Sequence, residues 1–551
     1  MALKKDLKEQ LYAQYKGVQD VTLAYMNGEE KGPAVKKLSA LLGIYKDRTE
    51  VFMLRTRQNG GVLTVQNMRD MGDVMDQVGI TRGHLSTRQN VQLHGVPLTR
   101  IEEALKAFYE RGMVTRGGGG NTIRTNINSS RAGVSATEVF DTKPYLEGMW
   151  DYVFGYQRAF EFGRKFKVGF SSEACDDNGA GVQDIGFIPQ VVDGEKGFKV
   201  YGGGGMGRGA STGIVLFDFL PVKQVTQAVV AMIDVFYEKG NRENRSKGRL
   251  RFILQELGEE KFKEMYMDFF NKVVIPEEYL DFREIDYKPL VDKLTKFEDS
   301  AIESAEYKRW VERSVKETKF DDVVSVRLYV RKGDFNAEEF RTFADILTKV
   351  GSEEIRISPE QDAIIPLLHK SALPYLYRAL EQQLPKQAST NEMFDRHIVS
   401  CIGAEVCPIG ILASPAAALT VAESLDCLFG DRAELKNELF EEIVNSVLIS
   451  GCASSCSRNQ SSALGFHGAK KKIDGVSTEV YQVHVGGLIV EGNDHQLAKT
   501  DPTWLVKASD IGSFTSNVVA EFLSARENDE FTTLREFTIA KRDTFKIEDY
   551  I

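Results

Sequence analysis

The chain has 551 residues, more than one hydrophobic core usually supports, so we expect several lobes. Its 42% hydrophobic and 27% charged residues are ordinary for a globular protein and exclude general disorder. The net charge of -10 argues against a nucleic-acid binder, which would carry a basic excess. No apolar run is long enough to span a bilayer, and Met1–Asp6 lacks the apolar core of a signal peptide. We therefore expect a cytoplasmic protein with no membrane or nucleic-acid partner.

The first half of the chain contains a predicted strand–helix–strand unit. Val35 to Leu42 is apolar at helical spacing and precedes it. A strand is predicted over Val51–Arg57 and ends at Asn59-Gly60-Gly61. A helix follows over about Val65–Val78, and a second strand covers roughly His84–Val96.

The same plan returns far downstream. A strand, a helix and a strand are predicted there, over Val324–Arg331, Ala337–Val350 and Ile355–Ser358. In detail, Ser86–Asn90 corresponds to Ser358–Asp362, and Phe198–Gly203 corresponds to Tyr481–Gly487. Because order and spacing both repeat, we predict two copies of one αβ plan, each a small lobe followed by a larger one. The alternative is a chance likeness between common units.

A polar stretch from about Gln224 to Thr318 separates the two halves and is predicted to be helical. It contains the basic run Gly240–Arg249. Most runs of this kind are solvated faces, so the run alone indicates no site.

The spacing of the cysteines is more informative than their number. Six cysteines are too few for a disulfide scaffold in so long a chain. Cys175 and Cys427 stand alone, whereas the other four form a C-x5-C and a C-x3-C pair: Cys401, Cys407, Cys452 and Cys456. Four thiolates from two loops can enclose a cubane cluster, whose irons each need one protein sulfur. Structural zinc favours shorter spacings, and it remains an alternative, as do inert core cysteines or a disulfide.

These motifs, C-x5-C followed by S-G-C-x3-C, resemble the cluster motif of the sirohaem sulfite and nitrite reductase family. The resemblance covers nearly the whole chain. It implies a [4Fe–4S] cluster and a sirohaem, with Cys401, Cys407 and Cys452 on the cluster and Cys456 bridging cluster and haem iron. Ala453-Ser454-Ser455 departs from the family, which often has Pro-Asn and a small residue there. Hydrogen bonding around the cluster is therefore expected to differ, but not the ligation.

The resemblance also implies the fold. We expect an α+β, internally duplicated protein in which two ferredoxin-like half-lobes form one domain. Two larger mixed αβ lobes then surround the sirohaem and the Fe–S cluster. The expected divisions are 1–100 and 319–390 for the half-lobes, the first with an N-terminal segment, and 101–318 and 391–551 for the larger lobes.

Sirohaem carboxylates and an anionic substrate both need clustered cations, and arginine suits planar carboxylates. Arg55 and Arg57 stand two apart, which predicts one strand face. Thr87–Gly95, Gly120–Asn126 and Arg164–Lys167 resemble the family's haem-contact segment, glycine-rich loop and R-K-F-K segment. By this resemblance we expect the substrate to contact Arg57, Arg124, Lys165 and Lys167. We expect the sirohaem to contact Arg55, Arg88, Gln89, Gln92, His94, Arg164, Arg208 and Cys456.

The glycine-rich segment Gly202–Gly209 could suggest a nucleotide-binding loop. It lacks the following helix start and the later acidic residue that a dinucleotide fold needs. It resembles instead a family loop that approaches the haem, with Arg208 on a carboxylate.

The resemblance implies a six-electron reduction of sulfite to sulfide. Sulfite reductases typically have lysine at the position of Lys167, whereas plant-type nitrite reductases have asparagine. Nitrite reduction to ammonia is the alternative, and a non-enzymatic Fe–S electron carrier is a second one that leaves the basic segments unexplained. No flavin or nicotinamide motif is evident. The expected electron donor is therefore a separate ferredoxin or flavoprotein reductase subunit.

Overall fold

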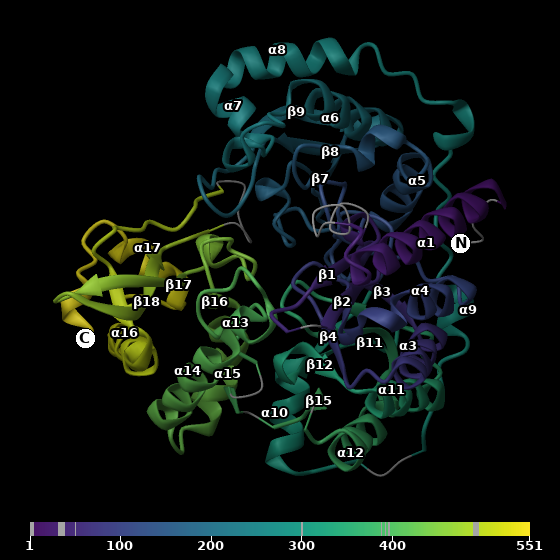
Figure 1. Ribbon diagram of the computed structural model, residues 1–551. Helices are drawn as coiled ribbons and strands as arrows, with labels where there is room; N and C mark the ends of the chain where they lie inside the picture. Colours follow the sequence, from purple (N-terminus) through teal and green to yellow (C-terminus); the bar gives the residue numbers. More distant parts are fainter. Residues whose placement is uncertain are drawn as a thin grey trace.

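The computed structural model describes residues 5–30, 39–49, 51–298, 301–386, 388–391, 393–394, 397–488 and 495–551. Figure 1 shows three parts, each with its own hydrophobic core. The small lobes of the two repeats lie together in the lower part of the view. The chain from Ile123 to Ile275 lies above them, and the chain from Phe394 to Tyr550, green to yellow, lies at the left.

The two small lobes share two sheets. The first sheet runs through β1 (Ile44–Lys46), β2 (Val51–Arg55), β5 (Val91–Pro97), β4 (Arg82–Leu85) and β12 (Asp334–Phe335). The second runs through β10 (Val315–Glu317), β11 (Val323–Val330), β14 (Ala363–His369), β13 (Glu354–Ile357) and β3 (Val62–Thr64), and β15 (Ala388–Ser389) pairs with β11. Each repeat thus gives one short strand to the other's sheet, since β12 pairs with β4 and β3 with β13. This exchange and the shared core join the half-lobes into one domain.

The helices of the two small lobes begin and end alike. Both α3 (Val65–Val78) and α11 (Ala337–Val350) start with a capping box, in which the cap and the third helical residue exchange hydrogen bonds. Each ends at a glycine with left-handed backbone, Gly79 or Gly351. The two helices pack side by side (Figure 1). The predicted duplication and both predicted helices are confirmed.

The predicted strand over His84–Val96 is wrong, because the segment is a hairpin of β4 and β5. Its turn closes where the Ser86 N–H donates to Asn90 O at 2.9 Å, and Gln89 takes a left-handed backbone with φ 54°. The second repeat makes the same turn, with Ser358 N–H donating to Asp362 O at 3.0 Å. Gln89, a polar residue at positive φ, breaks the extended backbone, so the segment cannot continue as one strand.

The two larger lobes repeat a four-stranded plan. In the first the order is β6 (Val168–Phe170), β7 (Ile185–Val192), β8 (Glu195–Gly202) and β9 (Ile214–Pro221). In the second it is β16 (Val447–Ser450), β17 (Leu464–Ile473), β18 (Val476–Val485) and β19 (Leu505–Lys507). The first pair of strands is parallel and the others are antiparallel in both lobes. The domain limits expected at 100, 318 and 390 remain a prediction.

Helices cover these sheets and connect the lobes. They are α1 (Lys5–Met26), α4 (Ile101–Glu110), α5 (Lys143–Val153), α6 (Val225–Lys239), α7 (Arg251–Leu257), α8 (Glu259–Phe270), α9 (Lys288–Val291), α10 (Ala305–Ser314), α12 (Leu373–Gln383), α13 (Gly403–Val406), α14 (Ser414–Phe429), α15 (Ala433–Ser446), α16 (Ile511–Glu527) and α17 (Leu534–Lys541). The predicted helical stretch between the halves holds α6 to α10. Of the segment predicted helical near Val35–Leu42, residues 39–41 are helical and 35–38 lie outside the described residues. Among the helices described, none is both long and apolar enough to cross a bilayer.

Candidate active site

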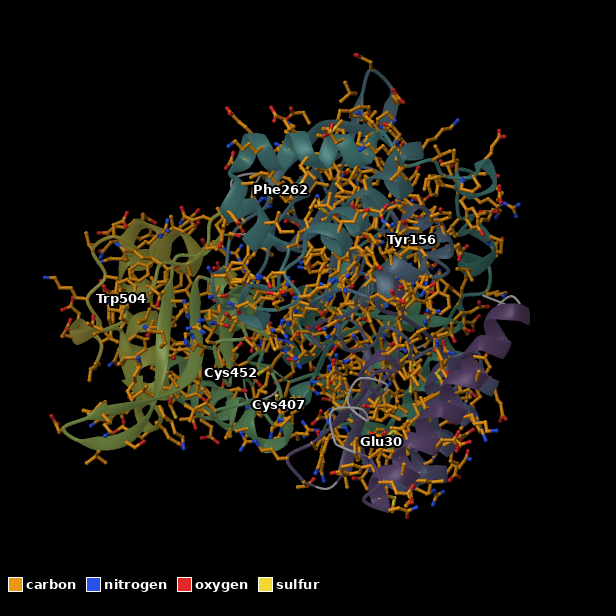
Figure 2. All side chains as sticks on the ribbon, turned by 45° about the horizontal axis from the view of Figure 1, so that its top comes forward. Glu30, Tyr156, Phe262, Cys407, Cys452 and Trp504 are labelled. Carbon is orange, nitrogen blue, oxygen red and sulfur yellow. The ribbon has the colours of Figure 1, made fainter. Side chains whose placement is uncertain are left out.

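The four paired cysteines line one cavity of about 210 Å³. Cys401 precedes α13, and Cys407 follows it directly. Cys452 and Cys456 lie in the loop that follows β16. All residues of β16 are buried, as the apolar run Val447–Ile449 predicts. Ser400 pairs with Ile449 of β16, which brings the two cysteine loops side by side. In Figure 2, Cys407 and Cys452 lie close together where the C-terminal lobe meets the rest of the chain.

The cysteine loops also offer polar groups to sulfur. The Gly451 N–H donates to Cys401 Sγ at 3.2 Å, and Ser414 Oγ lies 3.2 Å from the same sulfur. Burial raises the pKa of Cys401 to about 12 and also raises that of Cys407. The thiolate is the form that binds a metal, so a metal centre bound here would displace the thiol protons. Among the described residues, no three His, Cys, Asp or Glu side chains converge on one metal ion.

Cations line the same cavity. The expected site residues that line it, besides the cysteines, are Arg55, Arg88, Gln92, Arg124, Lys165 and Lys167. The Nε atoms of Arg55, Arg88 and Arg124 are buried and have no hydrogen-bond partner within the protein. Arginine Nε atoms elsewhere in the described chain also lack a partner, so it is the gathering of several cations at one cavity that favours an anionic guest there. Four thiols facing clustered guanidinium groups fit an iron–sulfur cluster beside a carboxylate-rich macrocycle.

Hydrogen bonds hold the Arg124 side chain against its glycine-rich loop. Its guanidinium donates to Gly118 O at 3.2 Å, to Gly120 O at 3.0 Å and to Tyr45 Oη at 3.1 Å. Arg55 donates to the same Gly118 oxygen at 2.9 Å. Glycines allow this close approach, since a Cβ at Gly118 would lie 2.8 Å from Arg55 O. Backbone oxygens of the loop, together with the Tyr45 hydroxyl, therefore fix the direction of these two arginines.

The hairpin turn between β4 and β5 connects the cations to the cysteines. Arg88 in that turn donates to Gln183 Oε1 at 2.7 Å and to Val168 O at 3.0 Å. Its neighbour Thr87 donates from Oγ1 to Cys456 O at 2.7 Å. The turn thus holds the first larger lobe and the cysteine loop of the second at the same edge of the cavity.

Lys165 and Lys167 flank Phe166, which is fully buried and points away from them. The Asp184 carboxylate accepts a hydrogen bond from the backbone N–H of Lys167 at 2.9 Å. It also forms an ion pair with Arg249 at 3.1 Å. Burial and nearby arginines lower the pKa of Lys165 to about 7, against the opposing effect of the Cys456 thiol. Burial, Lys165 and two arginines lower the pKa of Lys167 well below its ordinary value.

Arg57 lies outside this cavity, contrary to the expectation that it shares a face with Arg55. The strand β2 ends at Arg55, so strand alternation does not extend to Arg57. The Arg57 guanidinium donates to Ile123 O at 3.0 Å and Arg124 O at 2.7 Å. Its carbon lies 3.7 Å from the ring centroid of Trp150. Arg57 therefore braces the backbone that carries Arg124.

Four more expected contacts lie outside the cavity lining. Gln89 forms two hydrogen bonds with the main chain of Asn128, at 2.8 and 2.9 Å, because its left-handed backbone turns it away. His94 lies two residues beyond Gln92 on β5, about 7 Å farther along the strand, and is buried beside Asp47. The others are Arg164 and Arg208, the latter exposed on its loop.

Sequence reasoning missed several residues at the cavity. His84, Gln361 and Arg458 line it, and Tyr45 holds Arg124 from outside. Gln361 belongs to the repeated turn, and Arg458 lies two residues after Cys456. Both therefore lie beside motifs that the sequence had already singled out. Nothing in the sequence connects His84 to the cavity, because its partners come from the other repeat.

Comparisons with known proteins agree with this site. Residues 119–273 match the family described as nitrite and sulphite reductase 4Fe-4S domain, and residues 45–111 and 317–383 match the nitrite/sulfite reductase ferredoxin-like half domain. Together these matches cover more than half of the chain. The two half-domain matches fall on the two small lobes.

Curated relatives and a solved structure extend the likeness. A ferredoxin–nitrite reductase of Synechococcus elongatus is 27% identical over 450 residues, 80% of each chain. A sulfite reductase [ferredoxin] of Mycobacterium tuberculosis is 25% identical over 491 residues, 88% of this chain and 82% of that protein. The solved NirA protein of Mycobacterium tuberculosis has the same fold, with a TM-score of 0.78 and 21% identity over 95% of this chain and 92% of that one. The chain therefore belongs to the nitrite and sulfite reductase family, oxidoreductases that carry a sirohaem and a [4Fe–4S] cluster.

Proposed function

We propose that this protein reduces sulfite to sulfide by six electrons that a ferredoxin delivers. The observation that carries the choice of sulfite is a second half-buried lysine, Lys167, which lines the cavity together with Lys165. Two of the relatives above, a sulfite and a nitrite reductase, are named as ferredoxin-dependent, which supports ferredoxin as the donor.

Charge is the physical reason for preferring sulfite. Sulfite exists partly as a dianion at neutral pH, whereas nitrite is a monoanion. One extra cation a few ångströms away, in a cavity of reduced dielectric, favours the dianion by roughly 1–3 kcal/mol. This corresponds to about one to two orders of magnitude in relative specificity.

The lowered pKa values of the two lysines bear on their second task, proton donation. Burial among cations makes both ammonium groups better acids than a free lysine. An anion in the cavity raises both pKa values again, and a dianion raises them more than a monoanion. Sulfite binding is therefore linked to proton uptake by Lys165 and Lys167.

The residues of this chain then have distinct tasks. Arg124, Lys165 and Lys167 bind the anion and neutralise the charge that builds up on reduction. The lysines donate protons to each departing oxygen, and Arg57 keeps Arg124 in place through its backbone. A bound sirohaem and [4Fe–4S] cluster would supply the electron-transfer chemistry of the reduction. We propose Cys401, Cys407 and Cys452 as cluster ligands and Cys456 as the shared ligand.

Exchanging Lys167 for asparagine tests the substrate. Lys167→Asn is expected to lower kcat/KM for sulfite by roughly tenfold to a hundredfold and to spare or raise it for nitrite, because one cation is lost. Steady-state rates with both anions and an artificial electron donor measure this ratio. Lys223→Asn, an exposed lysine in the same lobe, is the control and should change neither rate. A wild-type protein with the higher kcat/KM for nitrite would overturn the assignment to sulfite.

A further inference from the structure

His84 connects the cavity to the surface through a carboxylate. Its Nδ1 lies 2.7 Å from Asp334 Oδ1, and its side chain is 4% exposed. Asp334 belongs to β12, the strand that the second repeat gives to the first sheet. Its other oxygen lies 3.0 Å from Nε of Arg82, and the side chains of Asp334 and Arg82 are 20% and 25% exposed. One end of this pair therefore meets solvent and the other lines the cavity.

Three groups face the His84 ring directly, and a fourth lies behind one of them. Asp334 approaches Nδ1, with Arg82 behind it, and Gln361 Nε2 lies 3.0 Å from Nε2. The ring of His94 is edge-on, at a centroid distance of 6.1 Å. Burial raises the pKa of Asp334, but the His84 hydrogen bond, His84 and Arg82 outweigh it and lower the pKa below the ordinary value. Asp334 therefore stays ionised and can accept a hydrogen bond from Nδ1 of the His84 ring.

The proposed reduction consumes protons in the cavity that His84 lines. Each oxygen that leaves the anion as water takes up two protons and two electrons, and the electrons come from the ferredoxin. Guanidinium groups hold their protons too tightly to supply them. Lys165 and Lys167 can supply protons, but each must be reloaded several times in one six-electron turnover. Histidine is the side chain suited to passing protons near neutral pH.

We propose that His84 and Asp334 form a relay by which solvent protons enter the cavity and reload the lysines. The relay rests on the proposed reduction and serves sulfite and nitrite alike, since both anions release oxygen as water. One proton enters at Nδ1 from the Asp334 side as the Nε2 proton leaves toward water in the cavity. The neutral ring must then turn over, so that its protonated nitrogen faces the cavity again, before the next proton passes. The amide of Gln361 must turn to release Nε2, and it lines the same cavity.

Two substitutions that keep side-chain volume test the relay. His84→Gln and Asp334→Asn are each expected to lower kcat about tenfold or more, with the larger loss at higher pH, and to raise the solvent deuterium isotope effect on kcat. His369→Gln is the matched control, because His369 caps a surface turn in the same domain. Its rate and isotope effect should equal those of the wild type.

Cofactor content and a second substrate separate the possible outcomes. Both variants should keep wild-type iron content and chlorin absorption. Loss of the chlorin band in folded His84→Gln would show an anchor for the haem and overturn the relay. An unchanged kcat and isotope effect would overturn it as well. If the wild type prefers nitrite, the choice of sulfite fails, but the isotope effect of His84→Gln on nitrite turnover still decides the relay.

Discussion

Replacing Cys456 by serine is expected to remove or strongly perturb the haem as well as the cluster. The proposed shared ligand joins two centres, so its loss affects both. Its backbone oxygen also accepts the Thr87 hydroxyl, which ties the loop to the cation-bearing turn. The wild type should contain about four irons with acid-labile sulfide and one sirohaem. Iron and sulfide analysis together with the visible spectrum measure the change.

Cys427→Ser is the matched control for that experiment. Cys427 is exposed on α14, and it does not line the cavity. Its replacement should leave iron, sulfide and chlorin absorption at wild-type levels. Haem absorption and content that stay unchanged in Cys456→Ser would show that the bridging assignment is incorrect.

Arg124→Ala should lower kcat/KM for the anion by roughly a hundredfold to a thousandfold, because a fixed cation is removed from the charge that builds up on reduction. Backbone oxygens and Tyr45 already hold the guanidinium in place, so little ordering is needed when the anion binds. Cluster content should stay at the wild-type level. Steady-state rates and iron analysis measure the two effects.

Arg131→Ala provides the comparison for Arg124→Ala. Arg131 follows the same glycine-rich segment but donates to Glu317 O and does not line the cysteine cavity. Its replacement should leave kcat/KM close to the wild-type value. If a folded Arg124→Ala protein lacks all bound cofactor, Arg124 is a structural residue and not a substrate ligand.

The repeated turns show how far a sequence correspondence can be carried. Ser86–Asn90 and Ser358–Asp362 form the same turn, with Gln89 and Gln361 both at positive φ. Their charges differ, since the residue corresponding to Arg88 is Glu360, which pairs with Arg458 of the cysteine loop. Duplication therefore predicts the backbone of the second turn but not its role. The role depends on which lobe faces each turn.

Local patterns by themselves determined the helices and the two close cysteine pairs of this protein, whereas the lysine pair was expected from the family resemblance. Periodicity, caps and short motifs act within a few residues, so Val65–Val78, Ala337–Val350 and the two cysteine pairs were readable directly. The tertiary structure alone decided which of the predicted site residues meet. Arg57 does not line the cavity because β2 ends before it. His84 lies beside the Asp334 carboxylate because the two repeats exchange strands. Contacts between distant segments depend on strand ends and lobe packing, which no local pattern encodes.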